Sequence, residues 1–232
     1  MSLPFVEGDA HHAFLKKALL DFGIPAAQFA QAWTTIKRTW ASKFNERAFL
    51  ATKKLGVRID QIYMAVLVQT IVPAEHAYVI HTTNPTNLED DEVYCEACKG
   101  LGEALVSDMP GQALSFAYHK RTKKITLGHY PNKPLGLSAT GFIFRSDSNS
   151  EDLPGFAGAG LFDSYPMHDT TQFRIAYHSS RVFNDAAFLA GFMKRLGEIG
   201  EHIEKIYDDE PQDIEGCFYN KQFYVVQTRP QV

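Results

Sequence analysis

The sequence is poor in cysteine and lacks long apolar runs, and each scarcity excludes a class of protein. Its 232 residues include 3 cysteines, an odd number that cannot pair completely, so a disulfide-stabilised secreted scaffold is not expected. A strongly apolar run at residues 64–68 is far shorter than the roughly 20 residues that cross a bilayer. Glu7 and Asp9 lie where a secretory signal would be apolar. We therefore expect an intracellular protein with no membrane partner.

The sequence also has no excess of positive charge and no low-complexity or periodic composition. The chain has 23 Lys and Arg against 27 Asp and Glu, a net charge of −4. Non-specific nucleic-acid binding needs a basic surface, so no nucleic-acid partner is expected. The 16 Gly and 11 Pro follow no period, which excludes a collagen-like chain. With 45% hydrophobic residues, the chain can bury a core as one large or two small domains.

Apolar periodicity predicts helices in two regions. Steps of three and four between Phe29 and Ala48 predict an amphipathic helix, and Gly56 supplies a stop. A second helix is predicted at 186–207, and its acidic residues, Glu204 among them, are expected to face solvent. The apolar residues expected to face inward on this second helix are Phe188, Leu189, Phe192, Met193, Leu196, Ile199, Ile203 and Ile206.

The remaining segments predict strands, loops and a division into lobes. Residues 63–71 and 77–81 are interpreted as strands of one two-strand unit, followed by a loop at 82–87. Residues 1–24 are interpreted as an N-terminal extension or tag remnant that leads into the helical region. The prolines within 128–136 predict the seam between two lobes there. Because helices and strands alternate without a strict βαβ rhythm, we expect an α+β fold.

The C-terminal segment predicts a β-hairpin that carries four polar side chains. With a three-residue loop, Glu215 lies opposite Gln227 and Asp213 lies opposite Arg229, and all four project from one face. Carboxylate and amide oxygens suit Mg²⁺, and a guanidinium suits phosphate, so a magnesium–polyphosphate ligand would fit. A two-residue loop would instead pair Glu215 with Val226 and weaken this idea. A surface hairpin with a plain Asp–Arg pair remains the alternative.

A second segment has the residue types of an anion site. A strand that ends at Arg145 is predicted to enter a polar loop and then Gly155, Gly158 and Gly160. Backbone N–H groups of small residues can approach an anion, and Arg145 can reach a phosphate. No Gly-Lys-Ser/Thr follows the glycines, so the segment is not a P-loop. A long surface loop is the alternative interpretation.

Three further features suggest chemistry but receive structural interpretations. Cys95 and Cys98 have redox or half-zinc spacing without a second pair, so we interpret them as packed side chains. His81 precedes the loop at 82–87 and is expected to form a structural hydrogen bond with it. Gly100 and Gly102 predict unusual backbone geometry or a close approach.

Taken together, these segments resemble the nucleotide-binding domain of the dikinases, the group that contains pyruvate phosphate dikinase and phosphoenolpyruvate synthase. The resemblance covers about residues 31–232 and is strongest to one branch, the α-glucan water dikinases that phosphorylate starch. Here the block that begins at Arg145 follows the helix containing Trp40, as in that branch. The order is reversed in the pyruvate and phosphoenolpyruvate enzymes. The resemblance rests on residues 40–48, 64–69, 79–85, 99–103, 110–111, 114–116, 145–164, 213–215 and 225–230.

The resemblance implies a fold, cofactors and residue roles. It implies an ATP-grasp-like domain that holds ATP between two lobes of mixed or antiparallel sheet flanked by helices. Arg145 and Arg229 would contact the phosphates as catalytic residues, Glu215 and Gln227 would bind Mg²⁺, and Asp213 would support the site. The implied reaction splits ATP to AMP and phosphate. The β-phosphate passes through a histidine to a glucosyl unit, so ATP and Mg²⁺ are the expected cofactors.

The resemblance also predicts what this chain does not contain. None of its 9 histidines lies in a matching phosphohistidine motif, and the upstream part of the nucleotide lobe is not recognised. Residues 25–232 are therefore interpreted as the C-terminal part of the ATP-binding domain of a multidomain enzyme. Its partners would be an upstream phosphohistidine domain and α-glucan held by upstream domains, in a plastid or the cytoplasm. Alone, it is expected to bind Mg·ATP weakly and to phosphorylate no glucan.

Three alternatives stay open within this interpretation. The chain could come from a phosphoglucan water dikinase, or from a pyruvate- or phosphoenolpyruvate-type dikinase. It could also be a catalytically silent binding module of the same fold.

Overall fold

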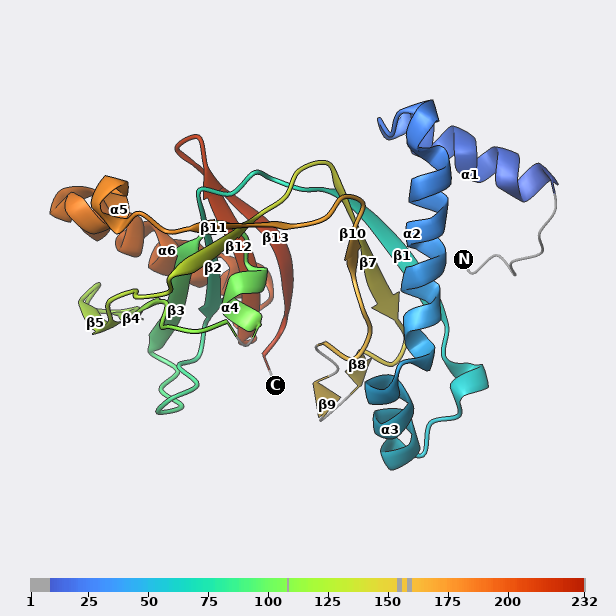
Figure 1. Ribbon diagram of the computed structural model, residues 1–232. Helices are drawn as coiled ribbons and strands as arrows, with labels where there is room; N and C mark the ends of the chain where they lie inside the picture. Colours follow the sequence, from blue (N-terminus) through green and yellow to red (C-terminus); the bar gives the residue numbers. More distant parts are fainter. Residues whose placement is uncertain (1–8, 108, 154–155, 158–159, 232) are drawn as a thin grey trace. The chain divides into compact units, whose positions relative to one another are not determined.

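The computed structural model describes residues 9–107, 109–153, 156–157 and 160–231. The chain forms two compact units that alternate along the sequence (Figure 1). Of the described residues, unit 1 holds those within 9–71 and 140–169, and unit 2 holds those within 72–139 and 170–231. The chain passes from unit 2 to unit 1 at 139–140, beyond the seam expected at 128–136. That segment lies inside unit 2 and connects two of its strands, so its prolines mark a turn within one unit.

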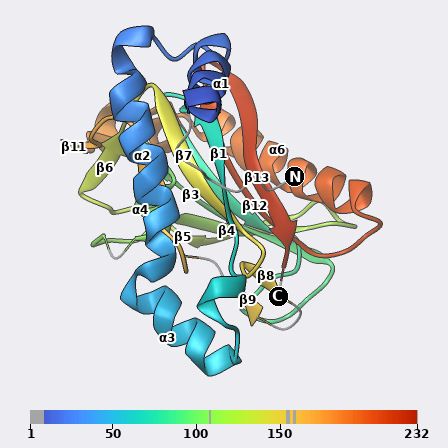
Figure 2. The ribbon, with the colours of Figure 1, turned by 90° about the vertical axis from the view of Figure 1, so that its right-hand side faces the viewer.

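Unit 1 is a small antiparallel sheet covered by a helix. Its sheet has the order β1 (Met64–Thr70), β7 (Phe142–Ser148), β10 (Tyr165–Pro166). The helix α2 (Phe29–Ala41) runs along this sheet (Figure 2) and buries Ala32 and Ile36 against Phe144 and Met167. The unit also contains α1 (Asp9–Asp21), α3 (Glu46–Leu55), β8 (Asp152–Leu153), β9 (Phe156–Ala157) and three 3₁₀ turns, Ala26–Gln28, Ser42–Phe44 and Ile59–Gln61.

The helix expected from Phe29 to Ala48 is two helices, because Asn45 begins a new one. Asn45 has an extended backbone, and its side-chain oxygen accepts a hydrogen bond from the backbone N–H of Ala48 at 2.7 Å. This is an N-cap, which periodicity alone does not reveal. Gly56 ends α3 in the left-handed conformation, with φ of 69°, which confirms the predicted stop.

Unit 2 is a six-stranded antiparallel sheet with a long helix on one face. The strand order is β13-β12-β2-β3-β4-β5. Helix α6 (Ala186–Ile206) packs Phe192 and Leu196 onto one face, against Tyr78, Tyr118 and Ile214. The strands are β2 (His76–His81), β3 (Glu92–Lys99), β4 (Leu114–His119), β5 (Ile125–His129), β12 (Gln212–Tyr219) and β13 (Gln222–Pro230).

Short elements complete unit 2. The helix α4 (Glu103–Val106) packs Ala104 with Ala77, Cys98 and Leu137 in a second, smaller core. Strands β6 (Leu135–Ser138) and β11 (Thr171–Arg174) form a two-stranded antiparallel sheet. The 3₁₀ turn Tyr177–Ser179 and the helix α5 (Arg181–Asn184) lead into α6. Helices with antiparallel sheets confirm the expected α+β class.

Two sequence expectations for these elements were wrong. The strands expected to form one unit, now β1 and β2, lie in different units and pair with different partners. On α6, Ile206 is 62% exposed, whereas Glu204 is 8% exposed and bonds Lys120 Nζ through both carboxylate oxygens, at 2.8 and 2.6 Å. Lys120 follows β4 and reaches the helix, so a buried acid is tolerated because it is paired.

Among the described residues, none of the helices has both the length and the apolar character needed to cross a membrane.

Candidate functional site

The C-terminal hairpin places the four predicted polar residues in the expected register. Glu215 pairs with Gln227 and Asp213 pairs with Arg229 across β12 and β13. Residues opposite each other in an antiparallel pair lie on the same face, as do residues two apart. The four side chains therefore share one face of the sheet in unit 2.

The register is reached by a different route from the one expected. The turn has two residues, Asn220 and Lys221, both at positive φ of 49° and 64°. This is the left-handed geometry of a tight hairpin turn. A shift between Glu215 and Gly216 then adds one residue, Val226, on β13. The bulge cancels the slip that a two-residue turn would cause, so Glu215 faces Gln227.

Tyr78 holds the bulged part of the hairpin. A Cβ on Gly216 would lie 2.3 Å from the Tyr78 ring, so the ring occupies the space beside the glycine. The Tyr78 hydroxyl donates a hydrogen bond to the carbonyl oxygen of Tyr224 at 3.0 Å. Burial raises the pKa of Tyr78 well above its usual value, so the hydroxyl remains a donor at physiological pH.

Asp213 is bonded by the guanidinium of Arg229, and its other oxygen lies beyond hydrogen-bond distance of the His81 imidazole. Arg229 Nε and Nη2 both donate to Asp213 Oδ2, at 2.9 and 2.6 Å. The other oxygen, Oδ1, lies 3.6 Å from Nδ1 of His81, which sits opposite Asp213 on β2. The Asp213 side chain is only 13% exposed. Its carboxylate therefore fixes the plane and position of the Arg229 guanidinium.

The second pair of the hairpin offers oxygen ligands. The side-chain oxygen of Gln227 is buried and has no hydrogen-bond partner in the part of the chain that the structure describes. A buried amide oxygen without a donor costs free energy unless a ligand satisfies it. Glu215, directly opposite, supplies a carboxylate. A hard cation such as Mg²⁺ is a ligand that both oxygens would accept.

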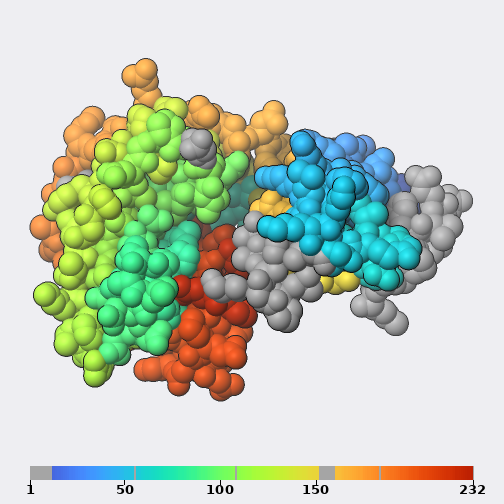
Figure 3. Space-filling view, turned by 90° about the horizontal axis from the view of Figure 1, so that it is seen from below, coloured from blue at the N-terminus to red at the C-terminus, as the bar shows by residue number. Residues whose placement is uncertain are grey.

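The open end of the hairpin is fixed to the loop that follows β2. Gln231 accepts a hydrogen bond from the Thr83 N–H at 3.1 Å and donates one to the Thr83 carbonyl at 2.8 Å. The Gln212 N–H donates to Thr82 Oγ1 at 2.7 Å. In the space-filling view the red C-terminal residues border the green loop of unit 2 (Figure 3). These bonds immobilise the strand ends that carry Asp213 and Arg229.

The fifth predicted residue, Arg145, lies in unit 1 and not on the hairpin. It pairs with Leu67 in the middle of β7, because the strand continues to Ser148 instead of ending at the arginine. Its Nη1 donates to Gln69 Oε1 at 3.4 Å. The expected position at a strand exit was therefore wrong, since β1 pairs with β7 beyond Arg145.

The glycines for which the sequence predicts unusual backbone geometry or a close approach do not all show it. Gly100 has φ of 85°, and a Cβ there would lie 2.2 Å from the Leu137 carbonyl oxygen, so both strain and a close approach require glycine. Gly102 has ordinary helical geometry with φ of −61°, against expectation. Gly160 has φ of 72°. Gly155 and Gly158 lie outside the described residues.

His81 has a different neighbour from the one that the sequence predicts. It was expected to bond the loop at 82–87, but its Nδ1 faces Asp213 Oδ1. The proximity of His81 to Asp213 follows from the pairing of β2 with β12, which places the two residues opposite each other. That pairing joins segments far apart in the sequence, and no local pattern specifies it.

The three cysteines are buried and free, which fits the expected packing role of Cys95 and Cys98. Burial raises the pKa of Cys98 to about 12 and that of Cys217 to about 11. Within the described ranges, no group of three or more His, Cys, Asp or Glu could hold a metal ion.

Comparison with known proteins identifies one family model and several relatives that match most of the chain. The family model described as "Pyruvate phosphate dikinase, AMP/ATP-binding domain" matches residues 16–232, and its match begins inside the region expected to be an extension. The chain is 46% identical over 227 residues to the chloroplastic alpha-glucan water dikinase of Solanum tuberosum, covering 94% of this chain and 15% of that protein.

Two other relatives extend the comparison. The chain is 47% identical over 208 residues to alpha-glucan water dikinase 1 of Arabidopsis thaliana, also chloroplastic, covering 88% of this chain and 15% of that protein. It is 25% identical over 236 residues to rifampicin phosphotransferase of Bacillus subtilis, covering 96% of this chain and 24% of that protein. The chain thus spans about 15% of the length of the glucan water dikinases that it matches.

Proposed function

The chain belongs to the family of the pyruvate phosphate dikinase AMP/ATP-binding domain, and we propose that it is the ATP-binding part of an α-glucan water dikinase. The proposed reaction splits ATP to AMP and phosphate. The β-phosphate passes by way of a phosphohistidine outside this chain to a glucosyl unit of a starch-like α-glucan. The relatives named alpha-glucan water dikinase support this reaction, and two of their names carry the word chloroplastic, which supports a plastid location.

The observation that carries the proposal is the shared face of the hairpin. Glu215 pairs with Gln227, and Asp213 pairs with Arg229. An acid, an amide and a guanidinium on one sheet face match the chemical groups of a metal-bound polyphosphate. Phosphoryl transfer needs mainly positioning and neutralisation of charge, and these groups supply both.

We assign Mg²⁺ to Glu215 and Gln227. The buried Gln227 oxygen without a hydrogen-bond partner among the described residues supports this assignment. Two protein oxygens leave most of an octahedral shell to phosphate oxygens and water, as is usual for Mg²⁺ at nucleotides. The bound ion would neutralise phosphate charge during transfer.

We assign the phosphates to the two arginines. The contacts between Asp213 and Arg229 hold Nε and Nη2 in place, so the remaining N–H groups of Arg229 can donate to phosphate oxygens. Asp213 is the residue that positions this guanidinium. Arg145 of unit 1 is proposed as the second phosphate-contacting residue on the strength of its motif, Arg-Ser-Asp-Ser.

Calorimetric titration of the whole chain with Mg·ATP tests the assignment. Arg229→Ala is expected to weaken binding about tenfold or more, because a charged hydrogen-bond partner is lost. Glu215→Gln is expected to weaken the dependence of ATP binding on Mg²⁺. Arg195→Ala and Glu198→Gln make the same charge changes on α6, where the two residues pair with each other at 3.2 Å. These controls should leave binding unchanged.

Two outcomes would contradict the proposal. If Arg229→Ala and Glu215→Gln bind Mg·ATP like the parent, the hairpin belongs to a silent module. A transfer assay with β-labelled ATP and amylopectin tests the need for an outside histidine. We expect no incorporation by the chain alone, and robust labelling would refute the role of an upstream phosphohistidine domain.

A further inference from the structure

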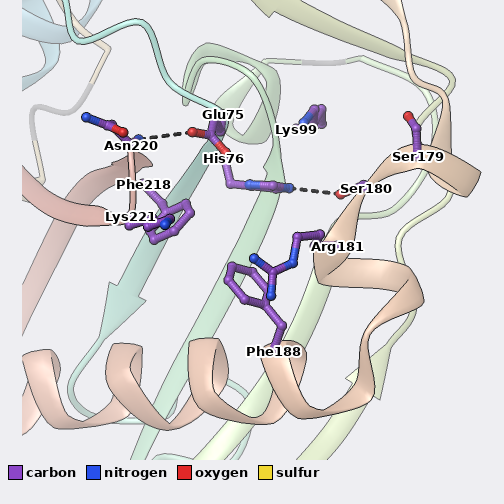
Figure 4. A pocket seen from close by; sticks show the side chains of 10 residues that line it. All are labelled: Glu75, His76, Lys99, Ser179, Ser180, Arg181, Phe188, Phe218, Asn220 and Lys221. Carbon is purple, nitrogen blue, oxygen red and sulfur yellow. Dashed lines mark hydrogen bonds between the residues drawn. The ribbon is translucent and has the colours of Figure 1, made fainter.

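Unit 2 contains a pocket that the proposed reaction does not use. It lies where the start of β2, the end of β3, the β12–β13 turn and the segment leading into α6 meet (Figure 4). Its volume of about 240 Å³ is below the roughly 300–1,000 Å³ of sites for drug-sized ligands. The pocket can therefore accept only a small molecule or a small part of a larger one.

The pocket and the hairpin quartet lie on opposite faces of the same sheet. Phe218, which lines the pocket, is three positions after Glu215 on β12, so strand alternation separates their faces. Phe218 pairs with His76, and His76 pairs with Lys99, so these three side chains share the pocket face. A ligand bound in the pocket would not overlap with one held by Asp213 and Glu215.

The floor of the pocket is apolar and aromatic. Phe218 is buried, and Phe188 from the first turn of α6 meets it with ring centroids 5.9 Å apart. The guanidinium of Arg181 lies 4.6 Å from the centroid of the Phe188 ring, and its Nη2 donates to Asp185 at 3.2 Å. These two contacts orient the guanidinium at the edge of the aromatic floor.

The walls of the pocket carry an excess of positive charge. Lys99, Arg181 and Lys221 line the pocket together with one carboxylate, Glu75, in a protein whose net charge is −4. Asp185, which is not a lining residue, pairs with Arg181 at 3.2 Å. Glu75 accepts a hydrogen bond from the Asn220 N–H at 3.0 Å, which directs one of its oxygens to the hairpin turn. Figure 4 shows the lysine and arginine side chains arriving from separate elements around the imidazole of His76.

His76 adds polarity without charge. The residue is 4% exposed, and its Nε2 lies 3.3 Å from the hydroxyl of Ser180, which also lines the pocket. Burial, together with the charge of Lys99, lowers the pKa of His76 to about 3. The imidazole is therefore neutral at physiological pH and leaves the positive charge to the two lysines and the arginine.

We propose that this pocket binds a phosphomonoester, with the phosphate between Lys99, Arg181 and Lys221 and a ring on Phe188 and Phe218. A phosphate monoester carries about −1.5 to −2 charges near pH 7, so the three cations attract it. Arginine donates to phosphate in pairs of parallel bonds, and lysine acts as a mobile point charge. The aromatic floor adds contact area for a flat group.

Titration of the whole chain with phenyl phosphate, inorganic phosphate and phenol tests the proposal. Phenyl phosphate is expected to bind in a saturable way and more tightly than either inorganic phosphate or phenol, because it uses both the cations and the floor. Lys99→Met and Arg181→Met should each weaken its binding about tenfold or more. Lys194→Met, an equal charge change on α6 beside Glu198, should leave it unchanged. Circular dichroism verifies that each variant is folded.

The outcomes separate this proposal from the assignment of the ATP site. Glu215→Gln should keep full affinity for phenyl phosphate even if it impairs Mg·ATP binding. Phe188→Ala should weaken phenyl phosphate binding and leave inorganic phosphate binding unchanged. The proposal is overturned if phenyl phosphate does not bind at millimolar concentration, or if Lys194→Met weakens binding as much as Lys99→Met does.

Discussion

At the scale of single residues, one buried histidine makes the stability of unit 2 depend on pH. The pKa of His76 falls from 6.5 to about 3, first because of burial and then because of the charge of Lys99. Between these two pH values the unfolded chain binds a proton that the folded chain excludes. Stability therefore falls as the pH decreases, by up to about 1.4 kcal/mol per pH unit from this group.

The prediction is that His76→Gln removes this part of the pH dependence. Urea unfolding followed by circular dichroism at about pH 7 and about pH 4.5 measures it, because the histidine contribution is present only at the lower pH. The parent should lose more stability on acidification than the variant does. His202→Gln replaces an exposed histidine on α6 and should behave like the parent. Equal losses in the parent and in His76→Gln would contradict the prediction.

The residues of the candidate site differ in how far the sequence predicted them. The pairs Asp213–Arg229 and Glu215–Gln227 were predicted correctly, because a hairpin joins residues that are close in sequence. The contact between His81 and Asp213 was not predicted, because it requires β2 to pair with β12. The choice of non-local strand partners depends on the packing of the whole sheet.

At the scale of elements, the hairpin depends on one glycine. A Cβ at Gly216 would meet the Tyr78 ring at 2.3 Å, and Tyr78 is fully buried and bonded to the Tyr224 carbonyl. Gly216→Ala is therefore expected to destabilise unit 2 by about 1–3 kcal/mol through overpacking. Denaturant unfolding measured by circular dichroism gives this value.

A second glycine supplies a control, because its replacement by alanine should raise the free energy of unfolding instead of lowering it. At Gly191, on α6, an added Cβ meets nothing within 4 Å, so Gly191→Ala should stabilise the helix by about 0.5–1 kcal/mol. If Gly216→Ala is as stable as the parent, the Tyr78 ring is free to move aside and does not hold the bulge.

The hairpin also shows that the sequence can predict the existence of an element without predicting its details. Two β-rich runs around a polar turn predicted β12 and β13 correctly. The sequence left the loop at two or three residues; the turn has two, and a bulge gives the register that was expected only for three. The bulge is accompanied by a contact from Tyr78 on β2, which the hairpin sequence by itself does not contain.

At the scale of the whole molecule, the two units have separate cores and separate spectroscopic probes. Trp33 and Trp40, the 2 tryptophans of the chain, pack against the core of unit 1. The three cysteines are all buried in unit 2. Tryptophan fluorescence therefore reports on unit 1, and thiol accessibility reports on unit 2.

We predict that unit 1 unfolds before unit 2 in urea. Its sheet has three strands, whereas the sheet of unit 2 has six strands and a long packed helix. More buried apolar area gives the larger unit more stability. The tryptophan transition should occur at lower urea than the exposure of the thiols to Ellman's reagent, and guanidinium should expose all 3 cysteines. Coincident transitions would show that the units unfold as one.

The sequence by itself determined the class of the fold, the long helix α6, the strands β1 and β2, and the C-terminal hairpin with its two pairs. These features follow from local periodicity, turn residues and neighbours on adjacent strands. Only the tertiary structure decided that β1 and β2 belong to different units, that His81 meets Asp213 and that a cationic pocket lies behind the sheet. Each of these depends on contacts between segments distant in sequence, and their pairing is chosen by the packing of the complete core and not by any local pattern.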